Sequence, residues 1–499
     1  MILLEQNSNE YNNDLRAMIM AFFPGIKIVE KLGEMDMPKF VFVARYEEEE
    51  TSLAILDDYS DAETIEGNYL DKSYFRNKLK SASYELLCRY TGRTLPWGDL
   101  TGVRPTKIAM ACLNDGKTFE DTVANYIDTY HVSERKAKLA TKVADFERNV
   151  IAKIDKENDY CLYVGIPFCP SRCLYCSFTS YPIGVYRDKA AMYVDKLCEE
   201  LDFIAREYKD KNLVSIYIGG GTPTSIDHML LDKLLTKIDT AFNLGQCIEV
   251  DGMNKDICDG GSTKVNLLRE YTVEAGRPDS ITIDKLKVMK AHGVSRISIN
   301  PQTMNDETLR TIGRAHTSAQ TKEAFYMARE CGFDNINMDL IAGLPGENMD
   351  SMRHTLGEIK ELSPESITVH SLAIKRAANL KQQMSEYGDS INQDMDAMLD
   401  MVSDLATELD MEPYYLYRQK KIGGNLENVG YAKKGLECLY NILIMEEITD
   451  IIAAGAGAST KLTYHAENRV ERVENCKSVD DYIDRFDEML GRKVKAFAE

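Results

Sequence analysis

Short apolar runs alternate with helical segments along the middle of the chain. Strands are predicted at 162–166, 214–218, 271–274, 296–299, 336–341 and 367–369. Apolar residues recur at helical spacing between them, at about 187–208, 228–242, 281–292, 318–331 and 349–361. Strands and helices in alternation predict parallel β/α units with right-handed crossovers. The chain is therefore expected to be an α/β protein whose residues 156–371 form an open, partial (β/α)6 barrel.

The flanking segments have a different pattern. Residues 1–155 contain three strand-like runs, a helical segment at 72–91 and a charged helical stretch from 109, which predict an α+β domain with a helical linker. Residues 372–499 predict a smaller α+β cap domain. The segment 246–270 has the features of an insertion between the second helix and the third strand. The turn-rich stretch Leu95–Pro105, with the only tryptophan, fits a docking loop or an ordinary structured linker.

A cysteine-dense loop follows the first predicted barrel strand. Its motif is Cys169-x3-Cys173-x2-Cys176, and Pro167 and Pro170 lie beside the first cysteine. Proline fixes φ and removes a backbone donor, so the segment is expected to leave the strand as a loop. Such a loop can bring three sulfurs together, which indicates a metal centre.

Three explanations of these thiols are possible: a zinc site, an iron–sulfur cluster, or buried side chains that bind no metal. A structural zinc ion takes four ligands, and no histidine or fourth cysteine follows within a few residues. A four-iron cluster held by three cysteines leaves one iron open. Alternatively, the thiols are small buried side chains. Because three of the 12 cysteines fall so close together, we expect the iron–sulfur cluster.

Two other polar features stand at the ends of predicted strands. Gly219-Gly-Gly-Thr-Pro-Thr224 follows the second strand, and its backbone can approach a ligand without a Cβ in the way, although a tight turn is the alternative. Glu274 ends the third strand, where a salt bridge to Arg296 is the alternative to ligand binding. Functional groups of β/α barrels lie at the carboxyl ends of the strands, so these features and the cysteine loop are expected on one face.

The cysteine motif resembles the signature of the radical S-adenosylmethionine (SAM) superfamily, in which the open iron binds the amino and carboxylate groups of SAM. Gly165-Ile-Pro-Phe168 and Tyr175 resemble a narrower branch, the oxygen-independent coproporphyrinogen III oxidases and their haem-chaperone relatives. Segments at 102–105, 413–419, 424–430 and 454–460, with the long N-terminal domain, resemble the HemZ type of that branch. The resemblance implies a radical SAM barrel.

The resemblance also implies the cofactors and their sites. A [4Fe-4S] cluster is expected on Cys169, Cys173 and Cys176, and no catalytic side chain is expected beyond the cluster and SAM. The implied SAM contacts include Arg296 and Asp339, which would bind a second SAM if two are bound, and Tyr163, for which barrel packing is the alternative. The full set of expected cofactor-binding residues is Tyr163, Tyr175, Gly220, Gly221, Thr222, Glu274, Arg296, Gln302 and Asp339.

The function implied by the resemblance is radical oxidative decarboxylation of coproporphyrinogen III, whose propionates become vinyl groups in protoporphyrinogen IX during haem biosynthesis. The implied partners are the tetrapyrrole substrate and a small reducing protein such as flavodoxin or ferredoxin. A substrate with four carboxylates needs cationic donors. Basic residues cluster around the predicted loops of the active face: Arg172, Arg314, His316, Lys375, Arg376, Arg418, Lys420 and Lys421.

Two positions depart from the dehydrogenase type. Phe178 stands where that type has a further cysteine, and Gly165 stands where it has a histidine; the haem-chaperone relatives also carry phenylalanine at the first position. Two alternatives therefore stay open. One is a haem-binding chaperone that does not decarboxylate, and the other is a radical SAM enzyme for another tetrapyrrole.

Composition limits the partners and the compartment. A formal charge of −20 argues against nonspecific binding to nucleic acid and to anionic membrane surfaces. The N-terminus shows no secretory signal, and no apolar run approaches the roughly 20 residues of a membrane span. Free thiols without a signal favour a reducing compartment, so we expect a cytoplasmic protein.

Overall fold

The computed structural model describes residues 1–498 except 34–35, 58–59, 103, 177, 245–246, 251–252, 258–262, 373–394 and 419–425. The chain forms two compact units. The first comprises Met1–Phe146 and the described parts of Ser371–Lys375 and Leu416–Asn428, and the second comprises the described parts of Glu147–His370, Arg376–Tyr415 and Val429–Glu499. The predicted domain boundaries, after 155 and after 371, stay predictions.

The first unit begins with a five-stranded sheet in the order β2-β1-β3-β4-β5. Its strands are β1 (Ile2–Gln6), β2 (Ile28–Val29), β3 (Val41–Tyr46), β4 (Glu50–Leu56) and β5 (Asp61–Glu66). Alternate residues of β4 are buried, so one face of the sheet packs on a core with Phe42 and with the helices α1 (Asn12–Phe22) and α2 (Lys72–Thr91). The predicted α+β character is confirmed, and α2 has the predicted bounds.

Three further helices follow: α3 (Thr106–Asn114), α4 (Phe119–Tyr130) and α5 (Glu134–Ile151). Thr118 and Asp121 form a capping box that starts α4. In the turn-rich loop before α3, the indole of Trp97 is fully buried and its Nε1 donates to Glu427 Oε2 at 2.6 Å in the same unit.

The second unit is built on an open eleven-stranded sheet, in the order β17-β18-β16-β15-β14-β13-β9-β6-β19-β20-β21. Six of its strands match the predicted barrel and follow one another in chain order: β6 (Asp159–Ile166), β9 (Asn212–Gly220), β13 (Glu270–Val273), β14 (Arg296–Ser298), β15 (Ile336–Ala342) and β16 (Ser366–Ser371). From β6 to β15 each pair is parallel. The partial (β/α)6 barrel is confirmed.

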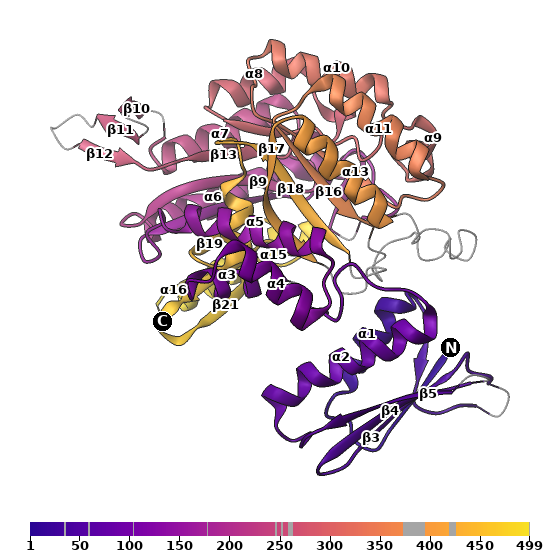
Figure 1. The fold of residues 1–499 in the computed structure, drawn as a ribbon. Helices are drawn as coiled ribbons and strands as arrows, with labels where there is room; N and C mark the ends of the chain where they lie inside the picture. The colour runs from indigo at the N-terminus through magenta and orange to yellow at the C-terminus, as the bar shows by residue number, and fades with distance from the viewer. Residues whose placement is uncertain are drawn as a thin grey trace. The chain divides into compact units, whose positions relative to one another are not determined.

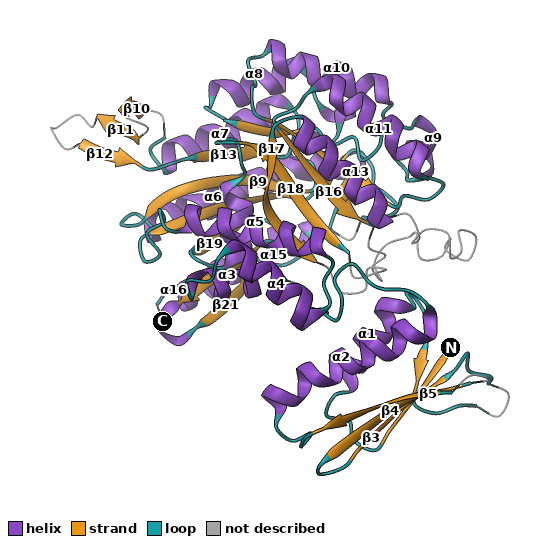
Figure 2. Cartoon of the chain, in the orientation of Figure 1, coloured by secondary structure: helices purple, strands orange, loops and turns teal. Residues whose placement is uncertain are grey.

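Helices connect these strands. The predicted helical segments correspond to α6 (Ile183–Glu207), α7 (His228–Ala241), α8 (Ile283–Ala291), α10 (Ser318–Glu330) and α11 (Met349–Leu362), and the short helix α9 (Asp306–Thr311) was not predicted. In Figure 1 and Figure 2, α8, α10 and α11 lie along one side of the strands. Between α7 and β13, the predicted insertion forms a separate antiparallel sheet of β10 (Cys247–Val250), β11 (Met253–Ile257) and β12 (Thr263–Asn266).

The C-terminal segment adds strands to both edges of the barrel sheet. β17 (Met411–Arg418) and β18 (Glu427–Lys433) extend it beside β16, and β19 (Asp450–Ala454), β20 (Ser459–Tyr464) and β21 (Arg469–Glu474) extend it beside β6. The helices of this segment are α13 (Met395–Glu408), α14 (Leu439–Glu446), α15 (Val479–Asp484) and α16 (Phe486–Phe497). Because β19 is parallel to β6, its carboxyl end lies at the same edge as the cysteine loop. None of the described helices is long and apolar enough to cross a membrane.

Candidate metal and cofactor site

The cysteine loop leaves the carboxyl end of β6 and is closed at its base by a short parallel pair. Phe168 pairs with Tyr181 and Cys169 pairs with Pro182, and the amide of Tyr181 donates to the carbonyl of Pro167 at 2.8 Å. The loop between them carries Cys173 and Cys176. The prolines thus mark the change from strand to loop, as predicted.

The three thiols are free and half-buried. Burial raises the pKa of Cys169 to about 11, and the nearby sulfurs of Cys176 and Cys173 contribute in the same direction. In the part of the chain that the structure describes, no three His, Cys, Asp or Glu side chains converge as ligands of one metal ion. Each cysteine of a [4Fe-4S] cluster binds a different iron, so the sulfurs of such a site stand apart.

The glycine-rich segment after β9 lies directly against the cysteine loop. The amide of Gly221 donates to Ile166 O at 2.8 Å, and the amide of Thr222 donates to Phe168 O at 2.7 Å. A Cβ on Gly221 would stand 2.5 Å from Phe168 O, so only glycine allows this approach. The Thr222 hydroxyl lies 3.5 Å from the Cys169 sulfur. The two sequence motifs form one site.

A half-buried carboxyl group stands beside this segment. Glu274, directly after β13, accepts a hydrogen bond from the Tyr217 hydroxyl at 2.5 Å. Burial raises the pKa of Glu274 to about 7, although the bond from Tyr217 acts in the opposite direction. A Cβ on Gly219 would stand 2.9 Å from the Glu274 carboxyl carbon, so the first glycine of the segment makes room for this side chain.

Of the expected cofactor contacts Arg296, Gln302 and Asp339, the structure brings Gln302 and Asp339 together. The amide of Gln302 donates to Asp339 O at 2.9 Å, and Gln302 has a left-handed φ of 69°. The Asp339 carboxylate accepts a hydrogen bond from Asn337 at 2.7 Å. Arg296 lies at the start of β14, fully buried, where its Nη2 donates to Ser366 Oγ at 3.2 Å and its Nε has no hydrogen-bond partner among the described residues.

Tyr163 and Tyr175 also lie at the site. The ring of Tyr163 stacks on Tyr217 with centroids 6.3 Å apart, and its hydroxyl is 3.1 Å from the position of a Cβ on Gly220. Tyr163 is therefore both a packing aromatic and a neighbour of the glycine segment. The Tyr175 hydroxyl accepts a hydrogen bond from Arg314 Nε at 3.2 Å.

Sequence reasoning missed one side chain beside the cluster loop. Arg277 is buried, its Nη1 donates to the Cys173 sulfur at 3.6 Å, and its Nη2 pairs with Asp279 at 2.7 Å. The signal was available, because Arg277 comes three residues after Glu274 in the same loop. Of the basic residues grouped from the sequence, Arg314 lies at the site, whereas Lys375, Arg376, Lys420 and Lys421 lie outside the described residues.

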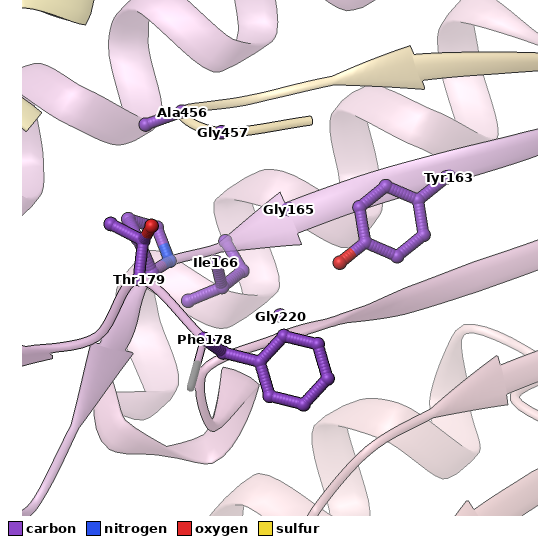
Figure 3. Close-up of a pocket in the computed structure, with 9 residues that line it drawn as sticks. Tyr163, Gly165, Ile166, Phe178, Thr179, Gly220, Ala456 and Gly457 are labelled. Atoms are coloured by element: carbon purple, nitrogen blue, oxygen red, sulfur yellow. The ribbon is translucent and has the colours of Figure 1, made fainter. Parts of the chain in front are cut away.

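A cavity of about 170 Å³ opens beside the loop. Figure 3 shows that Tyr163, Gly165 and Ile166 of β6 line it together with Phe178, Gly220 and the separate segment Ala456–Gly457. Phe178 is 67% exposed. The cavity is bordered by backbone groups and two aromatic rings, and its residues Phe178 and Thr179 belong to the loop that carries the cysteines. This donor set fits an iron–sulfur cluster with an organic cofactor beside it.

Comparison with known proteins agrees with the cysteine motif. Residues 163–359 match the family model described as the radical SAM superfamily. The chain is 38% identical over 431 residues to the oxygen-independent coproporphyrinogen-III oxidase-like protein HemZ of Bacillus subtilis, covering 85% of this chain and 82% of HemZ. The chain belongs to this HemZ-like branch of the radical SAM superfamily. Its cofactors are a [4Fe-4S] cluster and SAM.

Two other similarities accompany this one. The HemZ-like chain is 34% identical to the haem chaperone HemW of Bacillus subtilis, over 43% of this chain and 50% of HemW. Among solved structures, coproporphyrinogen III oxidase HemN of Escherichia coli aligns with a TM-score of 0.49 and 22% identity, covering 69% of this chain and 72% of HemN.

Proposed function

We propose that this HemZ-like protein is an oxygen-independent coproporphyrinogen III dehydrogenase. The observation that supports it most is the 38% identity to HemZ over 85% of the chain, which includes the segments on both sides of the barrel. The cysteine loop and the glycine segment, joined by hydrogen bonds at the carboxyl ends of adjacent strands, support the same chemistry.

In this proposal Cys169, Cys173 and Cys176 hold the cluster, and the cavity beside them receives SAM. When bound, the two cofactors together supply a radical that abstracts a hydrogen atom. Gly220 and Thr222 offer SAM backbone and hydroxyl groups next to Cys169, and Glu274 offers a carboxyl group. Tyr163, Tyr175, Gly221, Arg296, Gln302 and Asp339 complete the proposed cofactor-binding set, with Arg296 and Asp339 assigned to a second SAM.

The substrate reaction follows from this assignment. Loss of a hydrogen atom from a propionate side chain, then of CO2 and one electron, leaves a vinyl group. Two such rounds convert coproporphyrinogen III into protoporphyrinogen IX. The electron must pass to an acceptor, and a small reducing protein of the flavodoxin or ferredoxin class is the proposed donor to the cluster. The chain's residues bind and orient the reactants and exclude water.

A second candidate is a haem carrier that keeps the cofactors and does not decarboxylate. It is favoured by Phe178, which lines the cavity and is 67% exposed, and by the similarity to HemW. An exposed aromatic ring at the mouth of a cavity can stack on a flat macrocycle.

The test is anaerobic incubation of the reconstituted protein with dithionite, SAM and coproporphyrinogen III. The expected result is protoporphyrin in the oxidised extract together with 5′-deoxyadenosine. Deoxyadenosine without any change of the tetrapyrrole contradicts the dehydrogenase, and stoichiometric haem binding in that case supports the carrier.

The cluster ligands are tested separately. Cys173→Ala should remove the iron–sulfur charge-transfer band, whereas Cys331→Ala, at the end of α10 and outside the loop, should retain it. A band of wild-type intensity in Cys173→Ala contradicts the ligand assignment.

A further inference from the structure

A single hydroxyl group joins two walls of the cavity. Tyr193, in the middle of α6, is fully buried. Its hydroxyl donates to Gly165 O at 2.6 Å and accepts from the amide of Ala456 at 2.9 Å. Gly165 is the penultimate residue of β6 and Ala456 follows β19, and both line the cavity in Figure 3. The hydroxyl therefore bridges the two walls at the point where the pairing of β19 with β6 ends, at Ala454 and Val164.

The ring of Tyr193 also supports the cluster loop. It packs edge-on against Phe168, with centroids 5.2 Å apart and planes at 80°. Phe168 precedes Cys169 and its carbonyl accepts the amide of Thr222. One side chain of α6 therefore lies behind both the cysteine loop and the cavity wall.

A buried polar network binds Gly455, the residue before Ala456 in the loop after β19. Two helical turns after Tyr193, Glu200 Oε2 accepts from the amide of Gly455 at 2.8 Å and from the Tyr482 hydroxyl at 2.6 Å. Glu200 Oε1 accepts from Lys493 at 2.7 Å and from Asn475 at 2.8 Å. Asn475 also donates to Gly455 O at 2.9 Å. The network therefore binds both the amide and the carbonyl of Gly455.

The ion pair within the network is entirely enclosed. The side chains of Glu200 and Lys493 are both 0% exposed. Burial alone would raise the pKa of Glu200, but the Lys493 ammonium and the surrounding hydrogen bonds lower it below its usual value. An enclosed ion pair is often no more stabilising than an apolar pair of the same size, so it is poorly explained as a source of stability alone. What the pair does provide is an acceptor for the Gly455 amide, at Glu200, and a donor to Asn475, at Lys493; Asn475 in turn donates to Gly455 O.

The position of Gly455 has no room for a side chain. It has a φ of 99°, and a Cβ there would stand 2.4 Å from Gly165 O and 2.7 Å from the Tyr193 hydroxyl. A larger residue would push the loop off the end of β6. The loop after β19 is thus pressed against the first barrel strand and fixed there by Tyr193 and Glu200.

We propose that Tyr193 is a positioning residue for SAM, fixing the Gly165 and Ala456 walls of the cavity, and that the Glu200–Lys493 pair serves the same role through Gly455. The proposal rests on the placement of SAM in this cavity under the proposed function. Under this proposal the C-terminal helix α16, which carries Lys493, contributes to cofactor binding. This helix lies far from the cluster motif in the sequence.

The experiment compares Tyr193→Phe with Tyr208→Phe in the full-length, cluster-loaded protein. Both changes remove one buried hydroxyl that links α6 to the β19 region, but the Tyr208 hydroxyl binds Asp450, at the opposite end of β19 from Ala456. SAM affinity is measured by equilibrium dialysis, and the electron paramagnetic resonance signal of the reduced cluster is recorded with and without SAM.

The expected result for Tyr193→Phe is a normal charge-transfer band with SAM affinity weakened about tenfold, because both hydrogen bonds of the hydroxyl are lost. Its SAM-induced change in the resonance signal should be reduced at the same SAM concentration. Tyr208→Phe should bind SAM as the wild type does. Glu200→Gln, which keeps the shape but removes the charge, should weaken SAM binding in the same direction, with Glu199→Gln as its exposed control.

Wild-type SAM affinity in Tyr193→Phe overturns the proposal. Loss of the cluster band in Tyr193→Phe also overturns it, because the residue would then serve the cysteine loop and not the cavity. A wild-type protein that binds SAM but leaves coproporphyrinogen unchanged contradicts only the proposed decarboxylation and leaves this inference intact.

Discussion

Tyr217 on β9 donates a 2.5 Å hydrogen bond to Glu274, which directly follows the neighbouring strand β13, and both groups are half-buried. Burial raises the pKa of Glu274 to about 7, above its ordinary value of 4.5. A buried carboxyl with a raised pKa reduces stability once it ionises. Such a group is better explained by ligand binding than by packing.

Glu274→Gln is therefore expected to stabilise the cofactor-free protein at high pH. Ionisation of the buried carboxyl reduces stability as pH rises from 4.5 toward 7, and the full loss is present above 7. The variant should gain up to about 3 kcal/mol at pH 8 and little at pH 5. Urea unfolding at the two pH values measures this difference. The same variant should bind SAM more weakly, and a gain that does not depend on pH would contradict the explanation.

The Arg277 guanidinium next to Cys173 is expected to raise the reduction potential of the cluster. Its Nη1 donates to the Cys173 sulfur at 3.6 Å, and a positive charge with a hydrogen bond to sulfur stabilises the added electron. Arg277→Gln should lower the midpoint potential in a redox titration followed by electron paramagnetic resonance. Arg310→Gln, an exposed change on α9, is the control. An unchanged potential with an intact cluster would show that the contact is only structural.

The sequence predicts the barrel well because its strands are short runs of mostly buried residues and its helices have regular spacing. The Cys169 loop and Glu274 could be placed for a similar reason, since strand ends of a β/α barrel meet at one face. The buried residues that hold the cavity walls in place could not be predicted. Glu200 lies within a helix whose other charged residues are exposed, and its partner Lys493 is separated from it by 293 residues. No local pattern identifies such a pair.

The first unit contains a second enclosed ion pair, whose contribution to stability can be measured. Lys136 Nζ lies 2.8 Å from Glu427 Oε1, and the two side chains are 3% and 1% exposed. Glu427 also accepts from the Trp97 indole. Lys136→Met removes the cation and leaves a buried carboxylate, so the free energy of unfolding should fall by about 3 kcal/mol or more. Lys138→Met, which breaks the exposed pair with Glu134, should change it by less than about 0.5 kcal/mol. Denaturant unfolding followed by Trp97 fluorescence compares the two.

His292, directly after α8, lies between two carboxylates of α7. Its Nδ1 is 2.5 Å from Asp239 and its Nε2 is 2.9 Å from Asp232. Burial alone would lower the pKa of His292, but the two hydrogen bonds and charges outweigh it and raise the pKa above 6.5. Both ring nitrogens have an acceptor, so the protonated ring is the form that the site stabilises.

The stability that His292 contributes should therefore depend on pH in a defined direction. A raised pKa means that the folded state holds the proton more tightly, so the contribution is complete below pH 6.5 and is lost as pH rises through the folded pKa. His292→Gln should reduce the free energy of unfolding by about 1–2 kcal/mol at pH 6 and by less at pH 9. His228→Gln, an exposed change at the start of α7, should show no such dependence. An equal loss at both pH values would mean that His292 acts through packing, since the shape of the side chain is the same at both and only its charge differs.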